Sequence, residues 1–395
     1  AGWYSVRDEA FYLEKEIREE NGVKLAPTGA PVEWVEESSF FFKLSAFEDK
    51  LLELYASKPD FVMPKSRLNE VRSFVEGGLE DLSISRTTFS WGVPVPGHDG
   101  HVTYVWIDAL TNYLTAVGYP DMDTSNLARF WPADVHMVGK DILRFHAVYW
   151  PAFLMAADIA LPKRVFAHGW WTNDGQKISK SLGNVIDPFA LVDTYGVDQV
   201  RYFMMREVPF GNDGDFSDTA FVYRCNADLA NDMGNFAQRT LSMVFKNCDG
   251  QIPEPGTFTG DDTALLSAIE DSLGRARTLF DQQAIHLALD AIWQGVGAAN
   301  GYIATQEPWA LKKTDPERMK TVLYVAAEAI RMLSILIQPI VPTAAAKLLN
   351  QLKISEDKRD FSALNASNRL QAGTVIEQPQ GVFPRLDLPQ EAAGV

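Results

Sequence analysis

The sequence predicts an α/β unit with a doubly wound parallel sheet, followed by an all-α helical bundle. Two strand-and-helix pairs are expected, at 102–106 with 108–117 and at 135–138 with 141–157. This alternation is typical of parallel strands joined by crossover helices, in which ligands bind at the carboxyl ends of the strands. Beyond Asp218 the apolar residues repeat at helical spacing, as in Leu229, Met233, Phe236 and Val244, which indicates a bundle.

Caps, turns and apolar periodicity predict the remaining elements. The first 86 residues combine short strands with helices at 45–57 and 66–77. A single helix is expected at 188–206, and Asp187 suits its N-cap because Pro188 follows at the first helical position. The bundle helices are expected at 219–247, 261–282, 285–304, 308–313 and 317–337.

Length, charge and cysteine content restrict the class of protein. The 395 residues suffice for two or three domains with full cores. The two cysteines, Cys225 and Cys248, lack a Cys-x-x-Cys partner, which favours a reducing, cytoplasmic compartment and no structural zinc. The apolar stretch 321–342 contains Glu328 and Arg331, so a buried helix is expected there and no membrane span.

The formal net charge of −16 weighs against a nucleic-acid partner, because Lys and Arg contacts to phosphates supply most non-specific affinity. Weak non-specific binding is therefore predicted. A protein that reads a folded RNA by a few shaped contacts can still be acidic overall, if it uses local Lys and Arg.

The most informative stretch runs from Lys177 to Ser181 and reads Lys-Ile-Ser-Lys-Ser. A predicted strand at 165–171 and the turn at 173–175 precede it, and the helix that begins at Asp187 follows. Lysines on such a hairpin-like loop can swing over a bound polyphosphate and stabilise charge that develops in a transition state. A solvated surface loop without function is the structural alternative.

This loop resembles the second signature of the class I aminoacyl-tRNA synthetases. Four further segments are most similar to the methionyl-tRNA synthetase family within that class: Tyr-Val-Trp-Ile-Asp-Ala at 104–109, Gly-Lys-Asp-Ile at 139–142, Arg-Phe-His at 144–146 and Asn-Phe-Ala-Gln-Arg at 235–239. The resemblance runs from about Trp34 to Pro342 and covers most of the chain.

The resemblance implies a Rossmann-like catalytic domain with an inserted connective segment, followed by a helical domain. The implied domains are the remainder of the connective insertion at 1–86, the second half of the nucleotide-binding domain at 87–170, a lysine-loop and stem-contact segment at 171–218, a helical anticodon-binding bundle at 219–355 and a tail at 356–395.

The chain departs from the family pattern in two places. The family often carries a zinc knuckle near Trp3, but Ser5 and Asp8 stand where thiolates would be expected, so a metal-free version is expected. The tetrapeptide at 98–101, His-Asp-Gly-His, imitates the first class I signature but precedes a predicted strand instead of opening a helix. It is predicted to be a turn, and the true signature is expected in an N-terminal part that this chain lacks.

One predicted strand ends and the next helix begins at Gly139, Lys140 and Asp141. Nucleotides bind at such strand ends in parallel sheets. Locally, Asp141 could simply cap the helix, and His168 could be a structural turn histidine. The resemblance implies that Gly139 and Asp141 face the ribose of ATP. The position of His168 on the strand before the lysine loop also makes it a candidate to face the nucleotide.

Two walls of a side-chain pocket are expected around the helix that follows 102–106. The residues concerned are Trp106 at the strand end, Ala109 and Tyr113 on the helix, and Ile142, Phe145 and His146 on the facing helix. Without the resemblance these would be ordinary core residues, with His146 a satisfied core histidine. The resemblance implies a methionine pocket, since aromatic walls with one polar group suit a thioether; Leu110 replaces a proline found in some relatives.

In the bundle, Asn235 and Arg239 are one helical turn apart, and Trp309 follows Pro308 at a helix start. Taken singly, they read as a helix-surface pair and a core tryptophan. The resemblance implies that Asn235, Arg239 and Trp309 together bind anticodon bases by hydrogen bonding and stacking.

The resulting hypothesis is a cytoplasmic, monomeric ligase that joins methionine to tRNA through a methionyl-adenylate. The catalytic residues implied are Lys177, Ser179 and Lys180, with the lysines holding the leaving pyrophosphate and Mg²⁺ arriving with ATP. Two alternatives stay open: another class I synthetase for an apolar amino acid such as leucine, isoleucine or valine, and a non-catalytic tRNA-binding protein or fragment.

Overall fold

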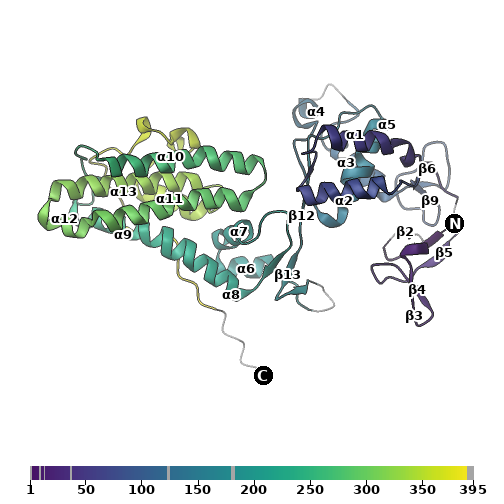
Figure 1. Ribbon diagram of the computed structural model, residues 1–395, viewed down its shortest axis with the longest axis horizontal. Coiled ribbons are helices and arrows are strands. Elements are labelled where there is room, and N and C mark those ends of the chain that lie inside the picture. Colours follow the sequence, from purple (N-terminus) through teal and green to yellow (C-terminus); the bar gives the residue numbers. More distant parts are fainter. Residues whose placement is uncertain are drawn as a thin grey trace. The chain divides into compact units, whose positions relative to one another are not determined.

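The computed structural model describes residues 2–8, 10–12, 14–35, 38–121, 125–178 and 183–388. The chain divides into two compact units, Ala1–His168 and Gly169–Val395, and each unit is described by itself (Figure 1). The first unit contains an α/β core, and the second contains a small hairpin sheet followed by helices.

The first unit is built on a parallel three-stranded sheet in the order β11-β12-β7. Its strands are β11 (His136–Gly139), β12 (Val165–His168) and β7 (Val62–Met63). The register pairs Gly139 with His168, so β11 and β12 end side by side. The parallel strand expected at 135–138 and the connection through a helix to the next strand are confirmed.

Helices cover this sheet and share its apolar core. Helices α1 (Glu48–Ser57) and α2 (Lys65–Glu76) lie side by side in Figure 1, near the helices expected at 45–57 and 66–77. Their buried side chains join those of the sheet in one cluster that includes Leu51, Val75, Val138 and Val165. Strand β7, α1 and α2 all come from within 1–86, so the domain boundaries expected from the sequence stay proposals.

The strand expected at 102–106 is much shorter than predicted. Strand β10 (Val102–Thr103) pairs antiparallel with β9 (Ser85–Arg86), and helix α3 (Val105–Thr115) begins immediately afterwards. The β-branched and aromatic residues at 102–106 favour a strand, but Leu110 and Leu114 are buried one helical turn apart and fix a helix instead. Trp106 therefore lies in the first turn of α3 and not at a strand end.

A helical run connects β11 to β12 and contains a π-helical turn. The run consists of η3 (Lys140–Ile142), the π-helical η4 (Phe145–Tyr149) and α5 (Trp150–Ala156). Pro151 has no N–H, so the carbonyl of Ala147 cannot receive the usual helical hydrogen bond from that position. The hydroxyl of Tyr55 on α1 supplies the missing donor at 2.7 Å. The wider turn carries Phe145 and His146, and such turns are frequent at functional sites.

Short antiparallel pairings make up the rest of the first unit. They are β1 (Gly2–Ser5) between β2 (Ala10–Tyr12) and β5 (Glu33–Val35), the hairpin of β3 (Arg18–Glu20) and β4 (Val23–Leu25), and β6 (Phe41–Phe42) with β8 (Leu82–Ser83). Helix α4 (Ser125–Phe130) and the 3-10 turns η1 (Glu14–Glu16) and η2 (Leu44–Phe47) complete it.

The second unit begins with a hairpin. Strand β13 (Trp171–Asn173) pairs antiparallel with β14 (Gln176–Lys177) and parallel with β15 (Gly214–Phe216). Asp174 and Gly175 form the turn with φ of 49° and 73°, a left-handed pair that suits a two-residue hairpin. The turn predicted at 173–175 is confirmed.

The single helix predicted at 188–206 is wrong, because two helices occupy this range: α6 (Pro188–Tyr195) and α7 (Val197–Arg206). Gly196 separates them with a φ of 93°, a conformation that strongly favours glycine. A side chain there would also meet Gln199 Oε1 at 2.7 Å. The start of α6 is as predicted, since the Asp187 carboxylate accepts a hydrogen bond from the Phe189 N–H at 2.9 Å.

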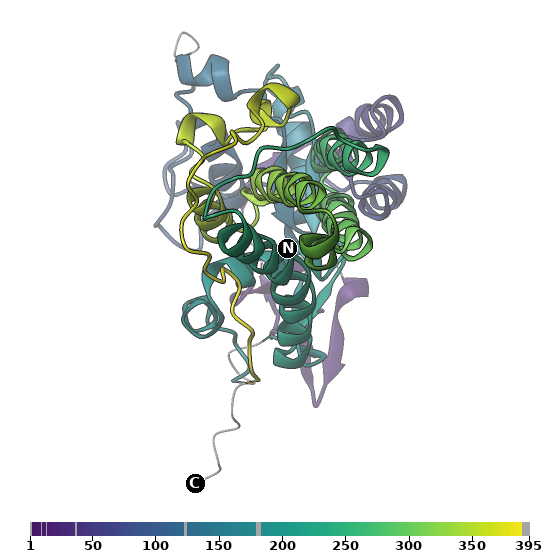
Figure 2. The ribbon, with the colours of Figure 1, turned by 90° about the vertical axis from the view of Figure 1, so that its left-hand side faces the viewer.

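The helical bundle follows, and Figure 2 views many of its helices nearly end-on. Its elements are α8 (Asp218–Arg224), the π-helical η6 (Cys225–Gly234), α9 (Asn235–Asn247), α10 (Gly260–Asp281), α11 (Ile285–Gln306), α12 (Pro308–Thr314), α13 (Pro316–Ile337) and α14 (Pro342–Gln351). The predicted bundle is confirmed, and α14 was not predicted. The 3-10 turns η7 (Glu356–Lys358), η8 (Phe361–Ala363) and η9 (Ala366–Asn368) follow it.

Helix α13 forms the centre of the bundle and is buried from Thr321 to Ile337. Its two charged core residues pair with each other: Arg331 Nη2 donates to Glu328 Oε1 at 2.6 Å, and both side chains are at most 1% exposed. The pair also anchors the segment after α14. Arg331 donates to the carbonyl of Ala363, and Glu328 accepts from the N–H of Leu370, each at 3.0 Å. In the described part of the chain, no helix is long and apolar enough to cross a membrane.

Replacing Arg331 by Met should destabilise the helical unit by about 3–5 kcal/mol, because an uncompensated carboxylate stays buried. Urea unfolding followed by far-UV circular dichroism would measure this loss. The matched control is Lys320→Met, which removes an exposed ion pair with Glu317 and should leave the midpoint unchanged. An Arg331→Met variant as stable as the wild type would contradict the role of the pair.

Candidate functional site

Four of the six side chains expected around the methionine pocket, those of Trp106, Tyr113, Phe145 and His146, come together between α3 and the run 140–149. The rings of Trp106 and Phe145 stack with centroids 3.8 Å apart and an interplanar angle of 9°. Tyr113 lies two turns further along α3, and its hydroxyl is 2.9 Å from His146 Nε2. Ile142 contributes its main-chain carbonyl, as described next. Ala109 lies on α3 between Trp106 and Tyr113, on the exposed side of the helix.

Hydrogen bonds fix the tautomer of His146. The carbonyl of Ile142 can only accept, and it lies 3.0 Å from His146 Nδ1, so Nδ1 carries the proton. Nε2 is then an acceptor, and the hydroxyl of Tyr113 donates a hydrogen bond to it. Burial lowers the pKa of His146, opposed in part by the Ile142 hydrogen bond. The imidazole is therefore held neutral, with its edge occupied by Tyr113.

A second buried histidine, His136, lies at the start of β11 and was not predicted as a site residue. Its ring centroid lies 4.3 Å from that of Tyr113 and 6.1 Å from that of His146. Burial, together with the nearby His146, lowers its pKa from the ordinary 6.5 to about 4. The signal in the sequence was its position two residues before the buried Val138 on the same strand face, which placed it towards the core.

The carboxyl ends of β11 and β12 bring Gly139, Asp141 and His168 together. Gly139 opposes His168 in the register, and a Cβ on Gly139 would lie 2.4 Å from Asp141 Oδ1 and 3.9 Å from His168 Cε1. The missing side chain of Gly139 thus makes room for the Asp141 carboxylate. The turn η3 begins at Lys140 with Gly139 in the N-cap position, so Asp141 lies inside its first turn and does not cap it.

The tetrapeptide at 98–101 forms a turn, as predicted. The N–H of His101 donates to the carbonyl of His98 at 3.3 Å, and the N–H of Val95 donates to the carbonyl of His101 at 2.9 Å. Both imidazoles lie against the ring of Phe40, with centroids 4.5 and 5.0 Å away. This packing gives the two histidines a structural role in the connection before β10.

In the second unit, Lys177 lies at the end of β14, where the described part of the hairpin stops. Its ammonium is 5.4 Å from the ring centroid of Trp170. The base of the loop is closed by the Asn184 amide, which donates to the carbonyl of Lys177 at 3.1 Å, while Asn173 donates to the carbonyl of Asn184 at 3.0 Å. Ser179 and Lys180 lie outside the described residues, and their expected roles stay predictions.

A carboxylate holds the opposite end of the same hairpin. Asp215 on β15 accepts hydrogen bonds from the hydroxyl of Thr172 at 2.6 Å and from the N–H of Gly175 at 2.8 Å. The Thr172 bond, and then the Gly175 bond, lower the pKa of Asp215. The turn is therefore fixed to the neighbouring strand at residues 172–175, and the lysine-bearing strand continues from a rigid base.

At the bundle, Arg239 and Trp309 line one small cavity of about 320 Å³ between α9, α11 and α12. The Arg239 guanidinium donates to Asn300 Oδ1 and to the carbonyl of Asn235, each at 3.3 Å. Trp309 is 52% exposed, so much of its indole surface is open to a partner. Asn235 is exposed one turn before Arg239 and contributes its main chain to this arrangement.

Ser5 and Asp8, at the positions where thiolates were considered, belong to a turn in which the N–H of Asp8 donates to the hydroxyl of Ser5 at 3.2 Å. Within the described ranges, no group of three or more His, Cys, Asp or Glu side chains is placed to hold a metal ion.

The parallel sheet, the hairpin bearing Lys177 and the following bundle define a class I aminoacyl-tRNA synthetase. Residues 2–241 match the family described as tRNA synthetases class I (M), and residues 252–393 match the anticodon binding domain of methionyl tRNA ligase.

Individual relatives agree with this assignment. The methionine–tRNA ligase of Brucella suis is 60% identical over 386 residues, which are 98% of this chain and 75% of that protein. The solved Mycobacterium tuberculosis methionyl-tRNA synthetase in complex with methionyl-adenylate is 56% identical, with a TM-score of 0.93 over 97% of this chain and 76% of that chain. The chain belongs to the methionine–tRNA ligase family and spans about three quarters of the length of these relatives.

The low pKa of His136 predicts a pH dependence of stability. The folded state keeps this imidazole neutral down to about pH 4, whereas the unfolded chain binds a proton below the ordinary 6.5. Stability should therefore fall as the pH drops from 6.5 towards 4. Imidazole ¹⁵N shifts during an NMR titration should give His136 a pKa below 5. The variant His136→Gln should make the midpoint of urea unfolding depend less on pH between 6.5 and 4. Titration of His136 near 6.5 would contradict the burial argument.

Proposed function

We propose that the chain ligates L-methionine to its tRNA in an ATP-dependent reaction through a methionyl-adenylate. The observation that carries this proposal is the neutral aromatic pocket of Trp106, Tyr113, Phe145 and His146 in a chain of the methionine–tRNA ligase family. The similar M. tuberculosis synthetase was solved in complex with methionyl-adenylate, which is the intermediate such a reaction requires. A monomer in the cytoplasm is part of the proposal.

The aromatic pocket supports methionine as the amino acid. A thioether is polarizable and gains contact energy at aromatic edges, and Trp106 and Phe145 offer such surfaces. Because His146 is neutral and hydrogen-bonded at both ring nitrogens, the pocket presents polarity without a charge. Shorter apolar side chains would lose about 1–3 kcal/mol per methylene. Selection therefore rests on filling the pocket more than on any single bond.

In the first step, a carboxylate oxygen of methionine attacks the α-phosphate of ATP, and pyrophosphate leaves. Gly139, Asp141 and His168 meet at the carboxyl ends of two parallel strands, so we assign them to the ribose and nucleotide. Lys177, Ser179 and Lys180 are assigned to the departing pyrophosphate, whose charge grows in the transition state. Mg²⁺ bound to the phosphates would neutralise part of that charge.

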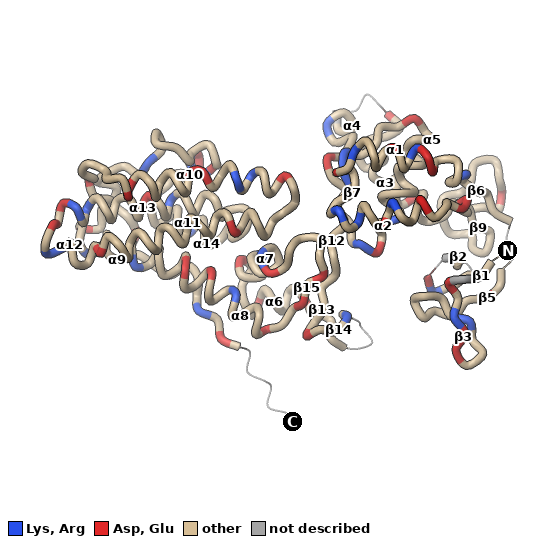
Figure 3. The backbone as a smooth tube through the Cα atoms, viewed as in Figure 1, with Lys and Arg blue, Asp and Glu red and all other residues tan. Residues whose placement is uncertain are grey.

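In the second step, a hydroxyl of the terminal ribose of tRNA attacks the carbonyl carbon, and AMP leaves. We assign recognition of the anticodon to Asn235, Arg239 and Trp309, because an exposed indole beside a guanidinium suits stacking on a base and hydrogen bonds to its edge. Lys312 and Lys313 on the same short helix as Trp309 add local positive charge, and Figure 3 shows basic residues at α12.

Methionine-dependent ATP–pyrophosphate exchange tests the catalytic assignment. Lys177→Ala and Lys180→Ala should each lower the turnover number about 100-fold, because each removes a donor to the leaving group. The KM for methionine should change little. The matched control is Lys163→Ala, whose ammonium pairs with Asp134 on the surface and should leave the rate unchanged.

The same assay separates the alternatives. Exchange supported by leucine, isoleucine or valine as well as by methionine would favour a synthetase for another apolar amino acid. Binding of tRNA without exchange for any amino acid would favour a non-catalytic tRNA-binding protein. Exchange that is unchanged in Lys180→Ala rejects the role given to the lysine loop.

The anticodon assignment predicts a separation between the two steps of the reaction. Trp309→Ala should weaken methionine tRNA binding by about 10- to 100-fold through loss of base stacking, while Trp309→Phe retains part of it. Arg239→Ala should act in the same direction. Filter binding and aminoacylation measure the loss, and pyrophosphate exchange without tRNA should stay unchanged. Lys347→Ala, on α14, serves as the control; an equal loss in that variant would contradict the assignment.

A further inference from the structure

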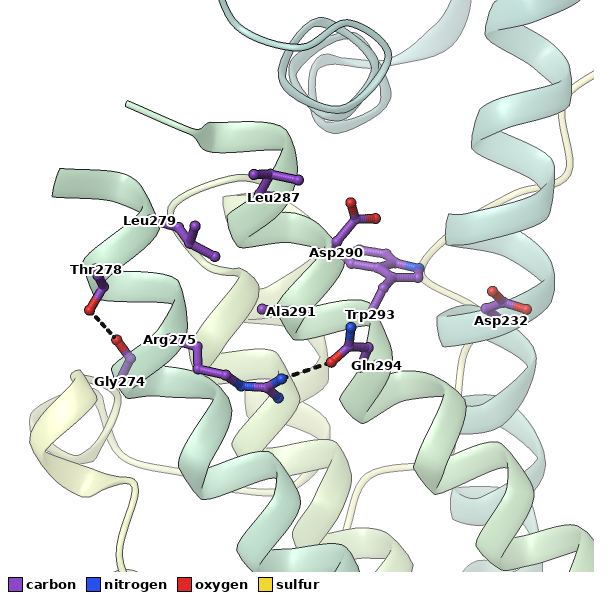
Figure 4. Close-up of a pocket in the computed structure, with 10 residues that line it drawn as sticks. All are labelled: Asp232, Gly274, Arg275, Thr278, Leu279, Leu287, Asp290, Ala291, Trp293 and Gln294. Atoms are coloured by element: carbon purple, nitrogen blue, oxygen red, sulfur yellow. Dashed lines mark hydrogen bonds between the residues drawn. The ribbon is translucent and has the colours of Figure 1, made fainter. Parts of the chain in front are cut away.

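A second and larger cavity, of about 910 Å³, opens in the helical unit between η6, α10 and α11 (Figure 4). It shares no lining residue with the cavity around Trp309. Along α11 its lining ends at Gln294, nine residues before Ile303 of the other cavity, which corresponds to about 14 Å. Its volume lies within the range of about 300–1,000 Å³ that is typical of small-molecule sites.

One wall of this cavity is aromatic and rigid. The indole N–H of Trp293 is directed at the main-chain carbonyl of Asp228 at 3.4 Å. Its ring also packs against Tyr202, with centroids 4.8 Å apart, and the Tyr202 hydroxyl donates to the Asp228 carboxylate at 2.7 Å. These contacts hold the indole in place. Leu279, Leu287 and Ala291 supply apolar surface beside it, and Gly274 leaves open space where any side chain would protrude.

The charged side chains that line the cavity differ in how they are held. Asp290 pairs with Arg206 at 2.6 Å, and Arg275 donates to Gln294 at 2.8 Å. Among the residues that the structure describes, no side chain forms a hydrogen bond or an ion pair with the carboxylate of Asp232. The side chain of Asn300 donates to the main-chain carbonyl of Asp232, at 3.1 Å, and not to its carboxylate. Burial and the neighbouring Asp228 raise the pKa of Asp232, as expected for an uncompensated carboxylate.

We propose that this cavity binds a small organic amine, with its ammonium between the Asp232 carboxylate and the Trp293 ring and its apolar body against Leu279 and Leu287. In Figure 4, Asp232 lies on η6 and faces the helix that carries Trp293. An ammonium there gains an ion pair with Asp232 and a cation–π contact with Trp293. An anion is disfavoured, because the described lining carries two carboxylates, Asp232 and Asp290, against one cation, Arg275.

The test uses three probes of similar shape and different charge: 2-phenylethylamine, 2-phenylethanol and 3-phenylpropionate. They are titrated into the chain by calorimetry, with excess methionine to occupy the aromatic pocket of the first unit. The amine should bind about tenfold more tightly than the alcohol, and the carboxylate should bind more weakly than either. Equal binding of the amine and the alcohol, or tighter binding of the carboxylate, overturns the proposal.

A matched pair of variants locates the site. Asp232→Asn keeps the side-chain shape and should reduce amine affinity to that of the alcohol, whereas Asp193→Asn, a carboxylate on α6, should leave the preference intact. Thermal midpoints confirm that both variants fold. A preference for the amine that survives in Asp232→Asn also overturns the proposal, because the ammonium would then bind elsewhere.

Discussion

The candidate nucleotide site depends on the parallel pairing of β11 with β12. This pairing places Gly139 opposite His168 and ends both strands at the same edge of the sheet. Backbone hydrogen bonds fix that register, so no side chain of the site has to hold it. The small residue at 139 then lets the Asp141 carboxylate fold back against the strand end. A shift of the pairing by one residue would move every one of these groups.

The same strand end determines the geometry of the aromatic pocket. The helical run leaves β11 at Gly139 and passes through a π-turn before Pro151, and the Tyr55 hydroxyl satisfies the carbonyl that the proline leaves without a donor. The extra residue of a π-turn changes the direction of the side chains that follow it. Phe145 and His146 lie on that turn and meet Trp106 and Tyr113 from α3. Backbone geometry therefore fixes the arrangement of these four side chains.

Much of this architecture could be predicted from the sequence, but not all of it. Strong periodicity and caps predicted the helices of the bundle up to α13, the turn at 173–175 and the start of α6 at Asp187. The failures were places where tertiary packing overrides local preference: Val105 and Trp106 favour a strand but join α3, and Gly196 divides an apparently continuous helix. His136 was missed because nothing in the sequence places β11 beside α3. The residue types in the candidate sites could be named from motifs, yet their interactions could not, since the bond between Tyr113 and His146 depends on how two separate helices pack.

The acidity of the chain is compatible with a tRNA partner, because the local field at one surface and not the net charge acts on a bound polyanion, and some carboxylates serve internal structure. Asp198 accepts from two N–H groups at the start of α14, and Glu328 pairs with Arg331 inside α13. Burial would raise the pKa of Asp262, but hydrogen bonds from Arg318 and Tyr302 lower it to about 2. Charges neutralised in this way contribute little to the field at the surface. These ion pairs already cancel within the formal charge of −16, so a polyanion near Trp309 would depend on the local positive charge of Lys312 and Lys313 on α12.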